Sequence, residues 1–385
     1  MRVGIDIRGI LSPHHDGSIG GGHYVFHLVR TLVSLHQDVD FVLFADRRLR
    51  HKDHDWLQSQ LNVELVVYRQ SFLTELLPAF YNEIVVAHAL KRARLDLLHI
   101  PLSSVRIPAS YQGKVILSLY DLAIYKAPEQ FSSFHKARQK AIKLFNINKA
   151  SAVIVPHQAT AKIVQEIFDF DRGKIFTVTP GVDDRFFGIM DTSTQNIAKQ
   201  YGVRQKYILA VGTVEPLKNL QRLMHAFALF RDKDRAMSGE DRSRYQLLIV
   251  GKSGMGSAAI RAFIRDLDLE NDVRFVGYVP GDDLAPLIMD ASCTVHTAFY
   301  EGLGLSVLES MAAKTPFALS NIPVHREIST DLNAYFFDPH DTHDMSSAIQ
   351  KAVSAEWKIS PEVDMGQYTW PRVAQQTIDL YRKIL

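Results

Sequence analysis

The chain has 385 residues, of which 46% are hydrophobic and 22% charged, and its formal net charge at pH 7 is +2. At roughly 150 residues a domain, this length predicts two or three globular domains. No apolar run reaches the ~20 residues that span a bilayer, and a net charge near zero without a nucleic-acid-binding motif argues against a nucleic-acid partner.

The first residues predict a buried strand rather than an export signal. Met1–Ile7 is mainly apolar, and Asp6 interrupts the apolar core that a signal peptide needs. The single cysteine, Cys293, excludes an intramolecular disulfide and is expected to be a small buried core residue. We therefore expect a cytoplasmic protein.

In the first half of the chain, short apolar runs alternate with helical patterns. Runs without polar alternation, separated by helices, indicate a parallel sheet covered on both faces. The predicted strands are 3–7, 41–44, 65–68, 97–100, 115–119, 152–155 and 175–177, and the predicted helices are 24–35, 134–147 and 160–168.

The second half repeats this alternation after the pattern weakens between 180 and 205. The polar stretch 231–244 is either a surface loop or an extension of the helix before it. Two doubly wound α/β domains with a cleft between them are expected, with ligands beyond the carboxyl ends of the strands. The predicted strands are 207–211, 246–250, 273–276, 293–297 and 317–320, and the predicted helices are 219–230, 258–267, 284–289 and 307–313.

Three glycines, Gly20 to Gly22, stand between the first predicted strand and the first predicted helix. The loop before them, 11–19, is too long for the dinucleotide-binding pattern G-x-G-x-x-G. Consecutive glycines at a helix entry let a ligand approach the backbone closely. A plain surface loop is the alternative.

The segment Val211–Asn219 follows a predicted strand and opens a helix. Lys218 is expected in the first helical turn, where a cation opposes the helix dipole by ~0.3–1 kcal/mol. That cost favours a second purpose for the lysine, and phosphate binding supplies one. A solvated surface lysine is the alternative.

The most informative segment is Glu301–Glu309, a glycine-rich turn between a predicted strand and helix with a carboxylate at each end. Such a turn directs backbone N–H groups at an anion, and carboxylates accept hydrogen bonds from hydroxyls. Together these groups would suit a nucleotide sugar. In the alternative, Ser306 and Glu309 form a capping box, and Glu301 is a solvated loop charge.

Gly212–Asn219 and Glu301–Glu309 together resemble the motifs of the retaining glycosyltransferases of family four, which have the GT-B fold. In that family a strand ends in G-x-x-x-x-x-K-[KN], and a later E-x7-E embraces the donor. Further segments match in order along nearly the whole chain: 20–22, 181–183 with Phe186, 273–277, and Trp370 before a last amphipathic helix.

The resemblance implies two Rossmann-like domains facing across a cleft: an acceptor-side domain, 1–185, and a nucleotide-sugar-binding domain, 186–367. A C-terminal helix, 368–385, would cross back to the first domain. By the same resemblance, Lys218 would neutralise the donor diphosphate, and Glu309 would accept hydrogen bonds from the ribose. Lys218, Glu301 and Asp121 would be the catalytic residues. The donor-binding residues would be Gly21, Gly22, Thr213, Lys218, Arg274, Val279, Glu301, Gly302, Leu303, Gly304, Leu305 and Glu309.

Four positions depart from the family's pattern. Thr213 stands where many members carry arginine, and Ser306 stands where proline is common. Proline suits the first position of a helix, so a residue here would lie inside the helix and leave Glu309 to the ligand. Tyr120 precedes Asp121 where many members have histidine, and a group with a pKa near 10 cannot replace a histidine near neutral pH. Lys314 stands where glycine is usual, and the sequence gives no reason.

Charge is divided unevenly along the chain. Residues 1–180 contain 22 basic and 16 acidic residues, a balance of +6, and the remainder has a balance of −4. Basic clusters in the first half would attract anionic lipid at ~1 kcal/mol per residue, although each alone suits a solvated helix face. They favour a peripheral enzyme on the inner face of the plasma membrane with a lipid-linked glycan acceptor. The clusters are Arg47, Arg48, Arg50 and Lys52; Lys91, Arg92 and Arg94; and Lys136, Arg138, Lys140 and Lys143.

The predicted reaction is sugar transfer from a nucleoside diphosphate sugar to an acceptor hydroxyl, with retention at the anomeric carbon, in surface polysaccharide synthesis. Lys218 and the N–H groups of Gly302–Leu305 would stabilise the leaving diphosphate, with no metal or other cofactor. The resemblance suggests GDP-mannose first, with UDP-glucose or UDP-GlcNAc next. The alternatives are a nucleotide-sugar epimerase or phosphorylase of the same fold, a two-domain ligand-binding protein, and a catalytically silent homologue.

Overall fold

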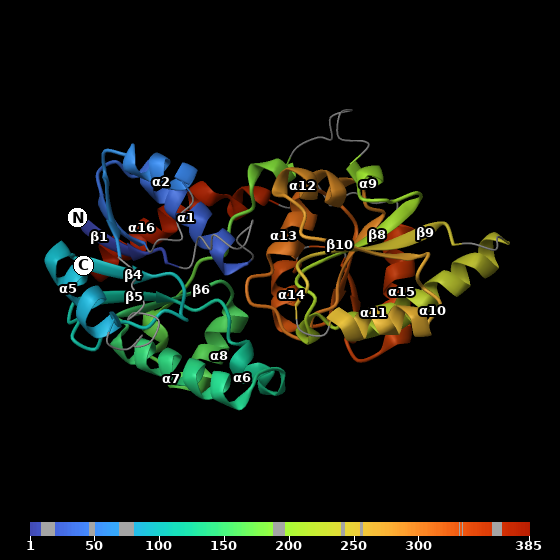
Figure 1. The fold of residues 1–385 in the computed structure, drawn as a ribbon, viewed down its shortest axis with the longest axis horizontal. Coiled ribbons are helices and arrows are strands. Elements are labelled where there is room, and N and C mark those ends of the chain that lie inside the picture. The colour runs from blue at the N-terminus through green and yellow to red at the C-terminus, as the bar shows by residue number, and fades with distance from the viewer. Residues whose placement is uncertain are drawn as a thin grey trace. The chain divides into compact units, whose positions relative to one another are not determined.

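The chain folds into two compact units, Met1–Gly181 with Gln367–Leu385, and Val182–Gly366; the domain bounds predicted from the sequence are 185 and 367. Each unit contains one parallel sheet with helices on both faces, as predicted (Figure 1). The computed structural model describes residues 1–8, 20–45, 51–68, 81–187, 197–239, 243–254, 257–330, 332, 334–355 and 364–385, without the side chains of 51–54 and 257.

Unit 1 is built on a seven-stranded sheet in the order β3-β2-β1-β4-β5-β6-β7. Every strand predicted in the first half is present. Central strands such as β4 are buried throughout, which is why their sequences lack polar alternation. The strands are β1 Arg2–Asp6, β2 Asp40–Ala45, β3 Val63–Val67, β4 Leu97–Ile100, β5 Lys114–Ser118, β6 Ala152–Val155 and β7 Ile175–Thr177.

The described helices of unit 1 include one from the far end of the chain, which packs beside the first helix (Figure 1). Trp370, at the start of this helix, lies against Gly181, where a Cβ would come within 2.7 Å of the Trp370 backbone nitrogen. Tyr381 is fully buried, and its hydroxyl lies 2.6 Å from Nδ1 of the buried His99. The helices are α1 Gly21–Leu35, α2 His51–Gln58, α5 Ala87–Ala93, α6 Ala123–Lys126, α7 Ser133–Lys149, α8 Gln158–Phe168 and α16 Trp370–Ile384.

Unit 2 is built on a six-stranded sheet in the order β10-β9-β8-β11-β12-β13. Cys293 is fully buried in its core, as predicted. The sequence does not predict one edge strand, Tyr335–Phe337. The strands are β8 Lys206–Val211, β9 Tyr245–Val250, β10 Val273–Gly277, β11 Cys293–His296, β12 Phe317–Ser320 and β13 Tyr335–Phe337.

The helices of unit 2 settle two points that the sequence left open. The first part of 231–244 extends a helix, which ends at Ser238. Lys314, just after another helix, has a left-handed φ of 56°, which explains why glycine is usual there. The helices are α9 Ile197–Gln200, α10 Leu220–Ser238, α11 Ser257–Asp266, α12 Gly281–Asp290, α13 Leu305–Ala312, α14 Pro323–Ile328 and α15 Thr342–Val353. Among the described residues of both units, no helix is both long and apolar enough to span a membrane.

Candidate active site

The predicted phosphate-binding lysine is positioned by a short turn rather than by a helix. β8 ends at Val211, and the chain makes a 3-10 turn over Pro216–Lys218 before α10 begins at Leu220. Asn219, between turn and helix, has a left-handed φ of 55°. The expectation of a lysine in the first helical turn is therefore wrong, because Asn219 separates the turn from the helix.

Hydrogen bonds fix this turn to distant parts of unit 2. The hydroxyl of Thr297 donates to the carbonyl of Lys218 at 2.5 Å, and the N–H of Phe299 donates to the carbonyl of Leu217 at 3.0 Å. The amide of Asn219 donates to the carbonyl of Pro339 at 2.7 Å. Because β8 and β11 are neighbours in the sheet, the loops after them are held together at its carboxyl edge, where ligands bind in such sheets.

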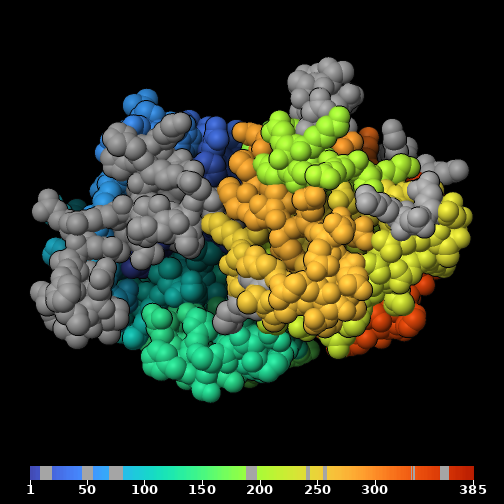
Figure 2. All heavy atoms as spheres, turned by 45° about the vertical axis from the view of Figure 1, so that its right-hand side comes forward, coloured from blue at the N-terminus to red at the C-terminus, as the bar shows by residue number. Residues whose placement is uncertain are grey.

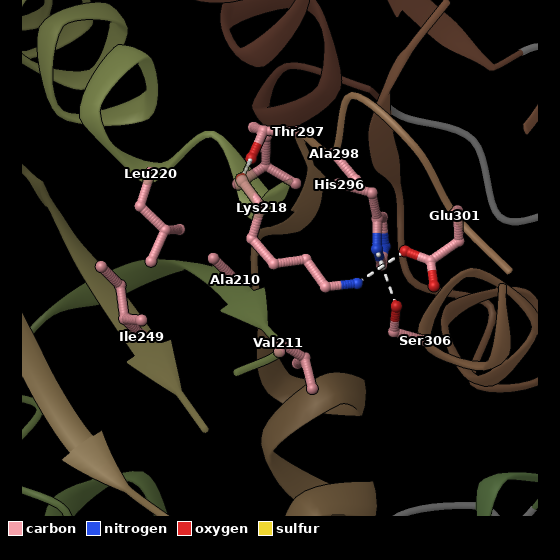
Figure 3. A pocket seen from close by; sticks show the side chains of 12 residues that line it. Ala210, Val211, Lys218, Leu220, Ile249, His296, Thr297, Ala298, Glu301 and Ser306 are labelled. Atoms are coloured by element: carbon pink, nitrogen blue, oxygen red, sulfur yellow. Dashed lines mark hydrogen bonds and ion pairs between the residues drawn. The ribbon is translucent and has the colours of Figure 1, made fainter. Parts of the chain in front are cut away.

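Lys218 and Glu301 meet in a pocket at this edge (Figure 3). The Lys218 Nζ lies 2.7 Å from the Glu301 Oε2, and the two side chains are 23% and 17% exposed. Burial alone would raise the pKa of Glu301, but the charge and hydrogen bond of Lys218 lower it below its ordinary value. The Glu301 carboxyl is therefore ionised at neutral pH, so the pocket offers a lysine for an anion and a carboxylate for hydroxyls. It is lined by Ala210, Val211, Gly212, Lys218, Leu220, Ile249, Val295, His296, Thr297, Ala298, Glu301 and Ser306.

The glycine-rich turn after Glu301 leads into α13 without a side-chain cap. Gly304 holds the cap position with a left-handed φ of 66°, and Ser306 is the second residue of the helix. The capping-box alternative is therefore wrong, because Ser306 lies inside the helix. The first N–H groups of α13 have no intrahelical partner. Beside the Lys218–Glu301 pair, they suit an anion.

Glu309 lies in the second turn of α13, half-buried. Its carboxyl makes no hydrogen bond or ion pair with any residue in the described part of the chain. Burial raises its pKa to about 8; the charge of Asp183 adds to this rise, and that of Arg185 opposes it. A carboxyl without a protein partner is available to hydroxyls of a ligand.

The remaining residues of the predicted donor loop lie between Glu301 and α13. Gly302 is half-buried, and Leu303 is 7% exposed. Thr213 is the second residue after β8 and lies close to Gly254, where an added Cβ would come 3.1 Å from the threonine methyl. These residues are close in the sequence to residues that line the pocket. Their contacts with a donor stay predictions.

Arg274 and Val279 are not among the residues that line the pocket. Arg274 lies on β10 with its guanidinium beside Gly202, and Gly202 precedes β8 whereas Lys218 follows it. Val279 is buried after β10. The structure thus brings Lys218 and Glu301 together in the pocket but not these two residues.

Three predicted residues belong to unit 1. Gly21 and Gly22 are the first residues of α1. Asp121 is exposed beyond the end of β5, and its Oδ1 accepts a hydrogen bond from the N–H of Ala123 at 2.7 Å. Their roles in donor binding and catalysis stay predictions.

Tyr120, which stands where a histidine is usual, is a core residue of unit 1. It is 4% exposed, and its ring centroid lies 4.3 Å from that of Tyr24. Burial raises its pKa well above the ordinary tyrosine value, and the neighbouring Tyr24 adds to the rise. Tyr120 therefore stays neutral, and its packing accounts for an aromatic residue here.

Two pocket residues, His296 and Ser306, were not assigned a donor-binding role from the sequence. His296 ends β11 and is 6% exposed, and its Nδ1 lies 3.2 Å from the Ser306 hydroxyl. The available signals were the histidine at the carboxyl end of a buried strand and the serine in place of the family's common proline. The pocket therefore contains one lysine, one carboxylate and one imidazole, of which the lysine suits an anion.

Several proteins of known activity are similar to this chain. O-antigen chain mannosyltransferase B of Escherichia coli is 24% identical over 275 residues, which is 70% of each chain. Mannosylfructose-phosphate synthase of Agrobacterium fabrum is 27% identical over 242 residues, 59% of this chain and 52% of that protein. The chain thus spans about half the length of the second relative, and 35% of another, the serotype-specific mannosyltransferase WbdA of Escherichia coli.

Solved structures share the fold at low sequence identity. HepE of Anabaena, in complex with UDP and glucose, has a TM-score of 0.72 at 17% identity, with 100% of both chains covered. Sucrose-phosphate synthase of Thermosynechococcus elongatus has a TM-score of 0.74 at 18% identity, covering 100% of this chain and 98% of that one.

Two family models divide nearly the whole chain between them. The model described as "Glycosyltransferase Family 4" matches residues 19–186, and the model described as "Glycosyl transferases group 1" matches residues 193–369. The first lies mostly in unit 1 and the second mostly in unit 2. With the two parallel sheets and the shared fold, these matches show that the chain belongs to the group 1 glycosyltransferases of family 4, with the GT-B fold.

Proposed function

We propose that this protein transfers a hexose from a nucleoside diphosphate sugar to an acceptor hydroxyl, with retention at the anomeric carbon and without a metal. The observation that carries the proposal is the Lys218–Glu301 pair at 2.7 Å, beside the uncapped start of α13. A lysine and a helix N-terminus suit a diphosphate. A carboxylate suits the hydroxyls of a sugar.

The proposed role of each residue follows from the negative charge that develops on the leaving diphosphate during the reaction. The leaving diphosphate gains charge as the glycosidic bond breaks, and fixed donors aimed at it lower the barrier. Lys218 would supply the cation, and the N–H groups of 302–305 would supply the dipoles. Glu309, whose carboxyl has no hydrogen bond or ion pair with the described residues, would accept hydrogen bonds from the ribose.

Mannose is the first candidate for the transferred sugar, and GDP-mannose the first candidate donor. Two of the relatives above carry mannosyltransferase names, and a third is a mannosylfructose-phosphate synthase. UDP-glucose is the second candidate, because the HepE structure was solved with UDP and glucose. UDP-GlcNAc follows on the family resemblance alone.

A lipid-linked glycan acceptor at an anionic membrane is supported by two exposed apolar side chains on α7. The buried residues of this helix are Lys143, which is 7% exposed and donates to the Ser103 hydroxyl at 2.9 Å, Asn146 and Ile147. Its outward side chains include Phe134, 80% exposed, and Leu144, 50% exposed. Figure 2 shows this segment, coloured green, at the surface. Helices of globular proteins ordinarily place their large apolar residues inward, so the exposure of these two residues favours a partner.

The structure corrects part of the prediction that three basic clusters face anionic lipid. Lys143 is buried and cannot face a lipid, whereas Lys136, Arg138 and Lys140 are at least partly exposed. No acidic residue occurs between 132 and 150. Lys91, Arg92 and Arg94 are exposed, as predicted. The cluster of Arg47, Arg48, Arg50 and Lys52 lies outside the described side chains.

The test is thermal stability of the full chain against GDP, UDP, ADP and their sugars. A ligand that binds only the folded protein at 100 times its Kd adds ~2.7 kcal/mol, or a rise in Tm of ~2–4 °C per kcal/mol. We expect one nucleotide to stabilise selectively, and Lys218→Ala and Glu309→Ala to lose the shift. The stabilising donor is then tested for sugar transfer.

Lys206→Ala is the matched control. Lys206 is an exposed lysine at the start of β8, whereas Lys218 follows the end of that strand. It should keep the nucleotide shift. The absence of a shift from every nucleotide at millimolar concentration would refute donor binding. A nucleotide shift without sugar transfer would favour the catalytically silent homologue.

A further inference from the structure

A layer of buried hydroxyl groups surrounds the imidazole of His296 beneath the pocket. Thr294 and His296 come from β11, and Ser306 and Ser310 come from α13. The His296 Nε2 lies 3.1 Å from the Thr294 hydroxyl and 3.3 Å from the Ser310 hydroxyl. Its Nδ1 lies 3.2 Å from the hydroxyl of Ser306, a residue that lines the pocket.

The direction of each hydrogen bond in this layer follows from one backbone acceptor. Ser310 Oγ lies 2.8 Å from the carbonyl oxygen of Ser306, so Ser310 must be the donor. In the 2.9 Å contact between Thr294 and Ser310, Thr294 is then the donor. The Thr294 oxygen can only accept from His296, so Nε2 bears the proton of the neutral ring. Nδ1 is therefore an acceptor, and the Ser306 hydroxyl donates to it.

The ring stays neutral in its surroundings. Burial lowers the pKa of His296 well below its ordinary value, and the charges of His325 and Lys218 lower it further. A neutral ring with Nδ1 unprotonated keeps the hydroxyl hydrogen of Ser306 directed at His296. What Ser306 offers to a ligand is therefore the lone pairs of its oxygen.

We propose that Ser306 is a specificity-determining residue that accepts a hydrogen bond from one hydroxyl of the donor sugar, with His296 as its positioning residue. The inference rests on the proposed function. Ser306 lines the same pocket as Glu301 and Lys218 (Figure 3). A sugar hydroxyl has a hydrogen to donate and an ionised phosphate has none, so an oxygen limited to accepting selects the sugar.

This assignment is particular to the present chain. The proline that is common at position 306 in the family has no hydroxyl and cannot make this contact. Ser306 is the second residue of α13, where the backbone N–H has no intrahelical partner. A proline there would lose no helical hydrogen bond, so the helix does not require the serine.

The experiment measures two dissociation constants by calorimetry for wild type and for Ser306→Ala. One is for the nucleoside diphosphate that stabilises the protein, and the other is for its nucleotide sugar. Loss of one uncharged hydrogen bond should weaken the nucleotide sugar about tenfold. The bare nucleoside diphosphate should bind both proteins equally, which also shows that the variant is folded. Ser347→Ala, at an exposed position of α15, is the matched control and should change neither constant.

Deoxyfluoro analogues of the nucleotide sugar identify the hydroxyl, because fluorine cannot donate a hydrogen. One analogue should bind wild type about tenfold more weakly than the parent sugar does. Ser306→Ala should bind that analogue and the parent equally. His296→Phe removes the acceptor at Nδ1 and frees the Ser306 hydroxyl to donate, so it should reduce this discrimination while leaving nucleoside diphosphate binding unchanged.

The outcomes separate the inference from the proposed function. Equal weakening of both ligands by Ser306→Ala, or no weakening of either, would overturn the role of Ser306 while donor binding stands. If wild type binds neither the nucleoside diphosphate nor its sugar, donor binding itself fails, and the role of Ser306 is refuted with it.

Discussion

The carboxyl of Glu309 keeps its proton to a higher pH than a free glutamate does. Burial and the charge of Asp183 raise its pKa from 4.5 to about 8, against the opposing charge of Arg185. Between pH 4.5 and about 8, the unfolded chain has released this proton and the folded chain has kept it. The contribution of the Glu309 carboxyl to the free energy of unfolding is therefore greatest below pH 4.5 and declines as the pH rises toward 8.

Glu309→Gln cannot ionise, so this decline should disappear in the variant. Without nucleotide, we expect the Tm of the variant to gain on that of wild type from about pH 5 to about pH 8, and then to keep a constant lead. Thermal denaturation across this range measures the difference. Glu270→Gln, at an exposed glutamate of the same unit, is the control. A Tm difference for Glu309→Gln that does not vary with pH would contradict the shifted pKa.

Lys314 holds a backbone conformation that its side chain disfavours. Its φ is 56°, and it is exposed after α13. A Cβ costs ~1–2 kcal/mol in this region and glycine avoids that cost. Lys314→Gly should therefore raise the free energy of unfolding by about 1 kcal/mol, measured by chemical denaturation. Lys314→Ala keeps the Cβ and should gain nothing; an equal gain from alanine would point to the lysine charge instead.

At the scale of elements, the proposed membrane contact is made by α7. Phe134 and Leu144 would enter the interfacial region of an anionic bilayer, while Lys136, Arg138 and Lys140 would lie near the head groups. We expect the double variant Phe134→Ser, Leu144→Ser to bind vesicles of phosphatidylcholine with phosphatidylglycerol about tenfold more weakly than wild type. Sedimentation with the vesicles measures the bound fraction.

The control for α7 is Leu61→Ser, because Leu61 is fully exposed in the same unit but outside this helix. It should bind vesicles as wild type does. Binding should also fall when phosphatidylglycerol is omitted or salt is raised. Equal vesicle binding by the double variant and wild type would show that α7 does not contact the bilayer.

The elements found from sequence are those whose pattern reflects burial. Central strands such as β4 are fully buried runs, and α1 has its apolar residues at helical spacing. The partly buried edge strand β13 was not predicted. The inward lysine of α7 was misjudged because its partner, Ser103, is far away in the sequence. Only the fold shows that partner.

At the scale of the whole molecule, the fold was predicted from the sequence, and Lys218 and Glu301 were assigned to the same donor site. Their two motifs follow strands that become neighbours in the sheet. The separation of turn and helix at Asn219 could not be predicted, because it depends on a left-handed residue held by Pro339. The role of His296 was equally hidden, since its partners lie on another element.

The return of α16 to unit 1 has a consequence for the order of events during synthesis. Trp370 and Tyr381 complete the core of unit 1, yet the ribosome makes them after all of Val182–Gly366. Domains ordinarily fold in the order in which they emerge. Here the sequence of unit 2 is complete before that of unit 1. Most of unit 1 is synthesised earlier, but its residues on α1 and β4 stay uncovered until α16 has been made.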